Sequence, residues 1–372
     1  MPTSYIALPA HHDHVGSLLR PAQLLLARGQ HLIGATSASA LKREEDKHIR
    51  EAIDLQQSVG LLSITDGEFR RGSAQNDFFM QLHGIRTEFP VRVVAERGRI
   101  RMAPPVMRVV DRIQRKQPVL RPIFEFLQSQ IAPGHTAKIT IPSPLMLHFR
   151  GGRAGISPEA YPNLEPDFYD DLVNVYVAEL QSLGDAGCRY VQFDATDLGY
   201  LCDAQMREAA RQRGEDPDTL PWQYARLMNR IVERKPAGML LALHICRGNF
   251  RSTWAATGGY EPVAEAVLQG MEMDAYFLEY DDARSGGFEP LRYLPPGKTA
   301  VLGLVGTKTG ALESSDALAR RIDEAAKHAP LSQLALSPQC GFASTYHGNH
   351  LGVDEQRAKL ELVVETARRV WG

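Results

Sequence analysis

The chain is poor in cysteine and in long apolar runs. Four cysteines in 372 residues would be a sparse disulfide framework for a secreted protein, so we expect them to be reduced thiols. No apolar run approaches the roughly 18 residues that a membrane span needs. The first residues also lack the basic and apolar regions of a secretory signal. These absences favour a cytoplasmic protein with no membrane partner.

The chain also lacks an excess of either positive or negative charge. Lysine and arginine number 42 against 44 aspartates and glutamates, a formal net charge of −2. No basic block of the kind that follows a phosphate backbone is present, which argues against nucleic acid as a partner. No Gly-x-Gly-x-x-Gly motif follows the first predicted strand, which disfavours a doubly wound nucleotide-binding sheet.

Short apolar strands alternate with helical patterns along the chain. Eight candidate strands lie near residues 14, 63, 139, 192, 242, 277, 302 and 335. Strand and helix alternating eight times is the sequence signature of a (β/α)8 barrel. We therefore predict an α/β TIM barrel that forms a single domain over residues 1–372. A β-hairpin insertion after the second strand, within about residues 75–134, is expected to cover the site.

One apolar run ends in an imidazole and a thiol two residues apart, in Leu241-Ala-Leu-His244-Ile-Cys246. Alternate positions of a strand share a face, so both side chains can reach one ion. The pair alone is a weak signal, because both residue types are common in cores. Two later runs end in Glu279 and Cys340. Two thiols, one imidazole and one carboxylate from three strand ends predict a catalytic Zn²⁺ site.

Further polar residues follow the other predicted strands. Ser17, Glu68 and Asp194 stand at strand ends that, in a barrel, converge on the same mouth as the metal ligands. The carboxylates are open to a second interpretation. Asp66, Glu68 and Asp194 would then be structural ion-pair partners of nearby arginines, the candidates being Arg70, Arg71 and Arg284.

Together these motifs resemble the cobalamin-independent methionine synthase family, namely its catalytic C-terminal barrel and its short single-barrel relatives. The resemblance spans nearly the whole chain and rests on Val15-Gly-Ser17, Thr65-Asp-Gly-Glu68-Phe-Arg-Arg71, Gln192-Phe-Asp194, His244-Ile-Cys246, Phe277-Leu-Glu279 with Arg284-Ser285, and Pro338-Gln-Cys340-Gly341. It implies zinc on His244, Cys246, Glu279 and Cys340. It also implies homocysteine at Ser17, Glu68 and Asp194, with the carboxylates holding the ammonium group.

Two departures from the two-barrel members concern the methyl donor. The chain shows one predicted barrel, whereas those enzymes use a second barrel to help hold a polyglutamylated folate. The segment Pro144-Leu-Met-Leu-His148-Phe149 has no tryptophan where they supply a folate-stacking one, and Lys308 lies near the position of their proton-donating histidine. The donor therefore stays open, as does the need for a protein that delivers it. Proton-transfer candidates for the leaving group are Asp66, His148 and Asp282.

We expect a zinc-dependent thiol alkyltransferase, an S-methyltransferase that converts homocysteine to methionine. A free thiol with a pKa of about 8.5 is only a few per cent thiolate at neutral pH, and bound zinc removes that limit. Three alternatives remain: opening of an epoxide or another electrophile by a thiol, as in coenzyme M transferases; a porphyrinogen-decarboxylase-like lyase; and a zinc-storage protein. The array of carboxylates favours catalysis over storage.

Overall fold

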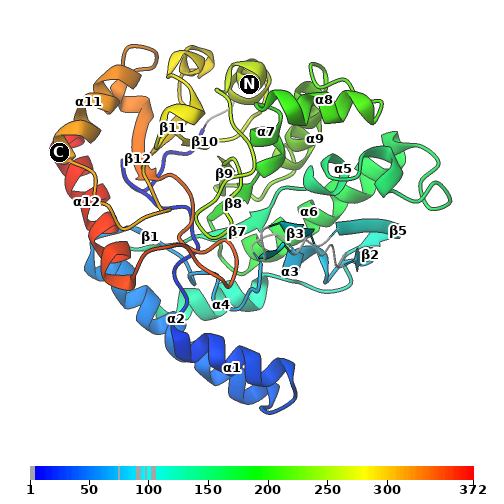
Figure 1. Cartoon of the computed structure of the whole chain (residues 1–372), viewed down its shortest axis with the longest axis horizontal. Coiled ribbons are helices and arrows are strands. Elements are labelled where there is room, and N and C mark those ends of the chain that lie inside the picture. Colours follow the sequence, from blue (N-terminus) through cyan, green and yellow to red (C-terminus); the bar gives the residue numbers. More distant parts are fainter. Residues whose placement is uncertain (1–4, 74–75, 89–93, 97–98, 102–105) are drawn as a thin grey trace.

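Six parallel strands form the main sheet of this computed structural model, which describes residues 5–73, 76–88, 94–96, 99–101 and 106–372. They lie side by side in chain order (Figure 1) and are β7 (Ile139–Pro142), β8 (Tyr190–Asp194), β9 (Leu240–Ile245), β10 (Ala275–Glu279), β11 (Thr299–Val305) and β12 (Leu334–Pro338). The register places Asp194 opposite His244. Two predicted site residues therefore lie at the same level near the ends of neighbouring strands.

Two further segments connect the edges of this sheet. β1 (Ser63–Ile64) pairs in parallel with β6 (Thr136–Ala137), which ends one residue before β7 begins. At the other edge His12 forms a parallel bridge with Leu336 of β12. Between them, the Thr65 hydroxyl donates to the Gly16 carbonyl at 2.7 Å. The contacts thus run in the circular order expected of a barrel, although the segment near residue 14 is extended chain with one bridge rather than a regular strand.

Helices follow the strands and lie around the sheet (Figure 1). The longer ones are α1 (Ala22–Leu32), α2 (Ala38–Ser58), α4 (Arg121–Gln130), α6 (Tyr169–Asp185), α8 (Ala204–Gln212), α9 (Leu220–Val232), α10 (Glu261–Ala264) with its continuation η3 (Glu265–Gln269), α11 (Ser315–Ala325) and α12 (Val353–Trp371). Short helices are α3 (Asn76–Phe79), α5 (Met146–Phe149) and α7 (Thr196–Tyr200). Short turns of other helix types are η1 (Gly152–Gly155), η2 (Leu164–Phe168), η4 (Ala283–Ser285), η5 (Glu289–Tyr293) and η6 (Leu331–Gln333).

The core is divided by the sheet into an outer and an inner part. On β9, Leu241 and Leu243 belong to the large cluster that contains the helices, whereas Leu240 and Ala242 belong to a small cluster with residues of the neighbouring strands. Successive strand side chains point to opposite faces. His244 therefore continues the inner row, which agrees with the face predicted from the sequence.

Antiparallel strands follow β1, as the sequence predicted. β2 (His83–Glu88) pairs with β5 (Val106–Gln114), and β3 (Val94–Glu96) with β4 (Arg99–Arg101). Parts of the expected cover, residues 89–93, 97–98 and 102–105, lie outside the described residues. Its last part is the helix α4, which contacts α2 and α6 as a regular helix of the α/β layer. Among the described residues, no helix is long and apolar enough to cross a membrane.

Candidate metal and substrate site

Three of the four predicted metal ligands lie together at the ends of the strands. One donor atom from each of His244, Cys246 and Cys340 lies within 4.8 Å of the other two, and all three residues are buried. The His244 imidazole interacts with the Cys340 thiol, and neither of its ring nitrogens has a nitrogen or oxygen partner. Because buried ring nitrogens normally have such a partner, this imidazole is available as a metal ligand. Sulfur and imidazole donors at this spacing fit Zn²⁺.

The charges in this cluster favour a bound cation. The adjacent Cys246 thiol and His244 imidazole hold the pKa of Cys340 well below its usual value. Interaction with Cys340 and burial raise the pKa of Cys246, so without an ion the pair resists a second ionisation. A divalent cation would remove that resistance by balancing two thiolates.

The carboxylate of Glu279, the fourth predicted ligand, contacts groups other than the three donors. Within the described part of the chain, no carboxylate joins the three donors within the 4.8 Å limit. Glu279 Oε2 accepts from the backbone N–H of Arg247 at 2.9 Å. Its Oε1 accepts from Arg284 and lies 3.9 Å from the Lys308 ammonium. Burial would raise the pKa of Glu279, but Lys308 and Arg284 outweigh it and the pKa is lowered.

Two of the predicted substrate residues are buried carboxylates that interact with each other. Glu68 Oε1 accepts from the Thr140 hydroxyl at 2.8 Å, while Glu68 Oε2 is buried without a partner. Asp194 Oδ1 accepts from the Gln192 amide at 2.8 Å. Burial and the charge of Glu68 raise the pKa of Asp194 to about 7, against the opposing effect of His244. A cationic group placed between Glu68 and Asp194 would relieve this repulsion.

Ser17, the third predicted substrate residue, lies against the segment that follows Cys340. Its hydroxyl accepts from the backbone N–H of Ala343 at 3.3 Å. A Cβ on Gly341 would lie 1.9 Å from Ser17 Oγ, so only glycine permits this approach. The Arg20 guanidinium donates to the carbonyls of Ala343 and Glu68, at 2.9 and 2.8 Å. Buried Arg20 therefore ties the Glu68 turn to the Cys340 loop, a role that the sequence did not reveal.

The three proton-transfer candidates have different surroundings. Asp66 Oδ1 accepts from the Glu68 backbone N–H at 2.9 Å, and its buried Oδ2 has no partner. His148 Nδ1 lies 2.9 Å from the Tyr224 hydroxyl, and burial lowers its pKa to about 4. Asp282 is about half exposed and caps η4 by accepting from the Arg284 N–H. Asp66 is thus the candidate in direct contact with a predicted substrate residue.

The ion-pair interpretation of the carboxylates holds only in part. Glu68 lies 3.8 Å from Arg71, a loose pair that leaves Oε2 unsatisfied. Arg70 instead pairs with residues of α2, and Arg284 pairs with Glu279 and its neighbours. Arg70 and Arg284 therefore form their ion pairs with carboxylates other than Asp66, Glu68 and Asp194.

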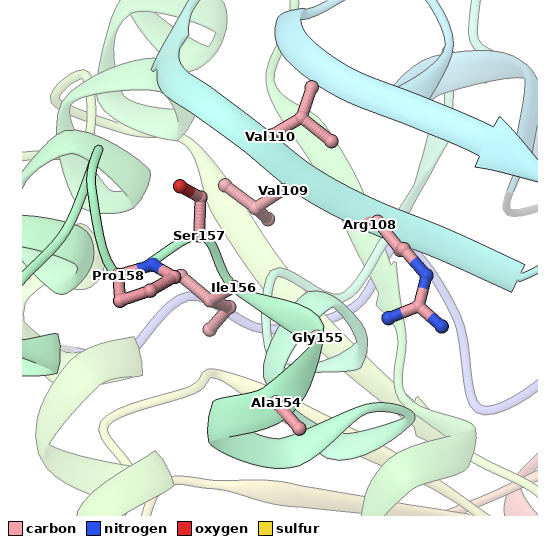
Figure 2. A pocket seen from close by; sticks show the side chains of 8 residues that line it. All are labelled: Arg108, Val109, Val110, Ala154, Gly155, Ile156, Ser157 and Pro158. Carbon is pink, nitrogen blue, oxygen red and sulfur yellow. The ribbon is translucent and has the colours of Figure 1, made fainter.

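The molecule also has a surface hollow away from these residues. It measures about 260 Å³ and lies between β5 and the end of η1 with the segment that follows it (Figure 2). Arg108, Val109, Val110 and residues 154–158 line it. None of the predicted metal or substrate residues contributes, so this hollow has no part in the site described above.

A family model described as "Cobalamin-independent synthase, Catalytic domain" matches residues 13–369 of the chain. The chain belongs to this family. It is 41% identical to the uncharacterized protein YxjH of Bacillus subtilis (strain 168) over 366 residues, 98% of this chain and 95% of that one. A crystal structure from Listeria monocytogenes, provisionally described as a vitamin-B12-independent methionine synthase, is 36% identical and superposes with a TM-score of 0.76 over 97% of both chains.

The chain is also similar to a more distant relative with a stated activity. The 5-methyltetrahydropteroyltriglutamate–homocysteine methyltransferase of Bacillus licheniformis is 23% identical over 324 residues, which are 86% of this chain and 37% of that protein. The family membership predicted from the sequence is thus confirmed. The buried cluster of His244, Cys246 and Cys340 is consistent with a metal centre in this cobalamin-independent synthase domain.

Proposed function

We propose that this protein is a zinc-dependent thiol alkyltransferase, with methyl transfer to homocysteine as its reaction. One observation carries the proposal: a buried cluster of two thiols and one imidazole shares its strand ends with two carboxylates, one of which has an unpaired oxygen. The first group suits Zn²⁺ and the second suits an ammonium group. An amino acid with a thiol side chain satisfies both requirements.

His244, Cys246 and Cys340 would hold the metal. Three protein ligands are the usual number in a catalytic zinc site, which keeps a position for substrate. Zinc, when bound, deprotonates a coordinated thiol while leaving the sulfur nucleophilic. Burial of the three residues excludes water, which would otherwise compete as a ligand or as a nucleophile.

Glu68 and Asp194 would orient the substrate through its ammonium group. The free Glu68 Oε2 is a ready acceptor, and a cation between the two carboxylates would lower the pKa of Asp194 from its raised value. Asp66, whose free oxygen lies in the same turn, is the proton-transfer candidate that the geometry favours. The reaction also needs a methyl or alkyl donor, which the site residues do not specify.

Zinc analysis and a methionine assay test the proposal. We expect one zinc per chain in the purified protein, and methionine from homocysteine with one donor among methyltetrahydrofolate, its triglutamate and methylcobalamin. Cys340→Ser should lose both zinc and activity. Cys188→Ser is the matched control, because Cys188 is buried elsewhere in the core, and should keep both.

The other outcomes separate the alternatives. Zinc without methionine would keep thiol activation but move the proposal to another electrophile, such as an epoxide opened by a thiol coenzyme. Decarboxylation of a porphyrinogen without any zinc requirement would favour the lyase. A chain that purifies without zinc and does not bind added zinc would contradict the proposed function.

A further inference from the structure

The loop that follows β9 contains a tight turn at residues 250–253. Phe250 and Thr253 exchange both backbone N–H to carbonyl bonds, at 3.3 and 3.0 Å. Between them, Arg251 and Ser252 have φ angles of 49° and 65°. Two consecutive positive φ angles between paired residues are typical of a type I′ turn, which favours glycine, asparagine or aspartate. The 250–253 turn therefore carries backbone strain at two residues.

Ser252 is bonded on three sides by neighbouring loops. Its hydroxyl donates to the Lys308 carbonyl at 2.5 Å and accepts from the His350 N–H at 2.8 Å. Its own N–H donates to Asn349 Oδ1 at 3.0 Å, and Asn349 Nδ2 donates to the Thr307 carbonyl at 2.9 Å. Because Lys308 follows β11 and His350 follows β12, one serine joins the loops that follow β9, β11 and β12.

Two of these loops carry the proposed thiol ligands. Cys246 precedes the turn in the loop after β9, and Cys340 precedes Asn349 in the loop after β12. A second bond joins the same two loops closer to the thiols, because Asn249 Nδ2 donates to the Gly341 carbonyl at 2.9 Å. In the sheet, β10 and β11 separate β9 from β12. The loop bonds therefore give the two thiols a direct connection that the strands do not provide.

The hydroxyl of Ser252 offers a reason for the strain. Glycine would adopt a φ of 65° at no steric cost, but it could not bond through a side chain to Lys308 and His350. Strained residues persist where their surroundings fix them, and they gather at functional sites. Arg251 has the same left-handed backbone, but its exposed side chain takes no part in the bonds of Ser252. Arg251 is thus a matched comparison for Ser252.

We propose that Ser252 is a positioning residue, which joins the loops of Cys246 and Cys340 so that both thiols stay at metal-binding distance before the ion enters. A site that is already ordered pays less conformational entropy when its ligand binds. The inference rests on the proposed function, because it concerns the same metal site. It gives the 250–253 turn a role that neither the predicted ligands nor the family description assigns.

A double-mutant cycle on the whole chain tests this role. The variants are Ser252→Gly, Asn349→Ala, the double variant and the control Arg251→Gly, with circular dichroism as the check on folding. Zn²⁺ affinity is measured by competition with a chromophoric chelator. The absorption spectrum of the Co²⁺-loaded protein reports the geometry of the metal ligands. Because the turn favours glycine at both positions, neither glycine variant should prevent folding.

We expect Ser252→Gly to lower zinc affinity about tenfold or more, a typical effect of losing a group that orients metal ligands. Its Co²⁺ spectrum should differ from that of the wild type. Arg251→Gly relieves the same kind of strain without removing a bond between loops, so its zinc affinity should stay within about threefold and its spectrum unchanged. Asn349→Ala should also weaken zinc binding, and the double variant should lose less than the two single losses combined, since both residues act in one set of bonds.

A zinc affinity of Ser252→Gly within about threefold of the wild type would overturn the inference. Equal losses in Ser252→Gly and Arg251→Gly would also overturn it, because they would assign the effect to the turn backbone instead of the hydroxyl. Fully additive losses in the double variant would contradict a shared set of bonds. In each of these cases a wild type that binds one zinc and forms methionine leaves the proposed function intact, whereas a wild type that binds no zinc would overturn both proposals.

Discussion

The backbone of Glu68 is held in a conformation that residues other than glycine seldom adopt. Its φ is 60°, and such residues gather at functional sites when their surroundings fix them. Here Arg20 binds its carbonyl at 2.8 Å and Asp66 binds its N–H at 2.9 Å. The strain places a carboxylate with one free buried oxygen next to Asp194. The turn thus has the features of a residue positioned to bind a ligand.

Glu68→Gln should therefore weaken substrate binding specifically. We expect the KM for homocysteine to rise about 10- to 100-fold, the usual cost of losing a hydrogen bond to a charged group, while zinc content is unchanged. Steady-state kinetics and metal analysis measure both. Glu45→Gln is the control, because Glu45 pairs with Arg28 and Arg70. An unchanged KM in Glu68→Gln would assign Glu68 a structural role.

Asp197 is a buried carboxyl group that should make stability depend on pH. Burial raises its pKa from the usual 3.8 to about 7, although the Leu198 N–H donates to Oδ1 at 2.8 Å. The protonated form therefore favours folding. Its contribution is complete below pH 3.8, is lost as pH rises toward 7, and changes no further above the folded pKa.

Comparison with Asp197→Asn isolates this effect. Between pH 5 and 6 the wild type should lose about 1.4 kcal/mol of unfolding free energy per pH unit relative to the variant, and the slope should fall by about half at pH 7. Urea unfolding of both zinc-free proteins across this range measures the difference. A difference that stays constant with pH would mean that Asp197 is ionised in the folded chain.

At the level of elements, α7 packs against the end of β9 through a glycine. A Cβ on Gly199 would lie 2.1 Å from the carbonyl oxygen of Cys246. The side chain of any other residue would push α7 away or shift the backbone of Cys246, a proposed metal ligand. The helix itself is five residues long, too short for the sequence pattern to indicate, so this constraint emerged only from the structure.

Gly199→Ala should consequently disturb the metal site. We expect a zinc affinity about tenfold lower or worse, in line with changes to residues that orient ligands, and a lower melting temperature. Gly29→Ala in α1 is the control, because nothing lies within 4 Å of the added Cβ. That change should leave zinc binding unaltered and stabilise the chain by up to about 1 kcal/mol. Normal zinc binding by Gly199→Ala would show that the loop adjusts without moving Cys246.

The elements predicted from the sequence are those with a clear period. The alternation in β9 indicated which face His244 occupies, and the apolar runs located the six strands of the main sheet close to their observed positions. The strand expected near residue 14 is irregular, because Gly16 has a φ of 136° and the neighbouring residues contribute side-chain hydrogen bonds. The hydrophobic period of a segment thus indicates which positions are buried, but it does not indicate the hydrogen bonds that side chains form with nearby backbone.

For the molecule as a whole, the convergence of distant residues was predictable once eight strands were counted. Parallel strands place their C-terminal ends at one mouth, which brought His244 and Cys340 together across 96 residues of sequence. The choice of partner for each charge was not predictable. Arg284 could have paired with several carboxylates, and only the fold shows that it binds Glu279 and Asp281.

The metal site should also stabilise the whole fold. Its donors come from the end of β9 and from the segment after β12, and β10 and β11 lie between those strands. An ion would therefore cross-link parts of the mouth that the sheet connects only indirectly. Because the unfolded chain does not hold the three donors together, metal binding should favour the folded state.

Zinc removal is expected to lower stability by about 4 kcal/mol when free zinc had been present at about 1,000 times its dissociation constant. Thermal unfolding with zinc and with EDTA measures this increment. Cys340→Ala should abolish the increment. Cys188→Ala should lower the melting temperature in both conditions, because it leaves a cavity in the core, yet it should keep the increment. Equal melting of the wild type with and without zinc would mean that the cluster does not hold the ion, because binding to the folded state alone must raise the melting temperature.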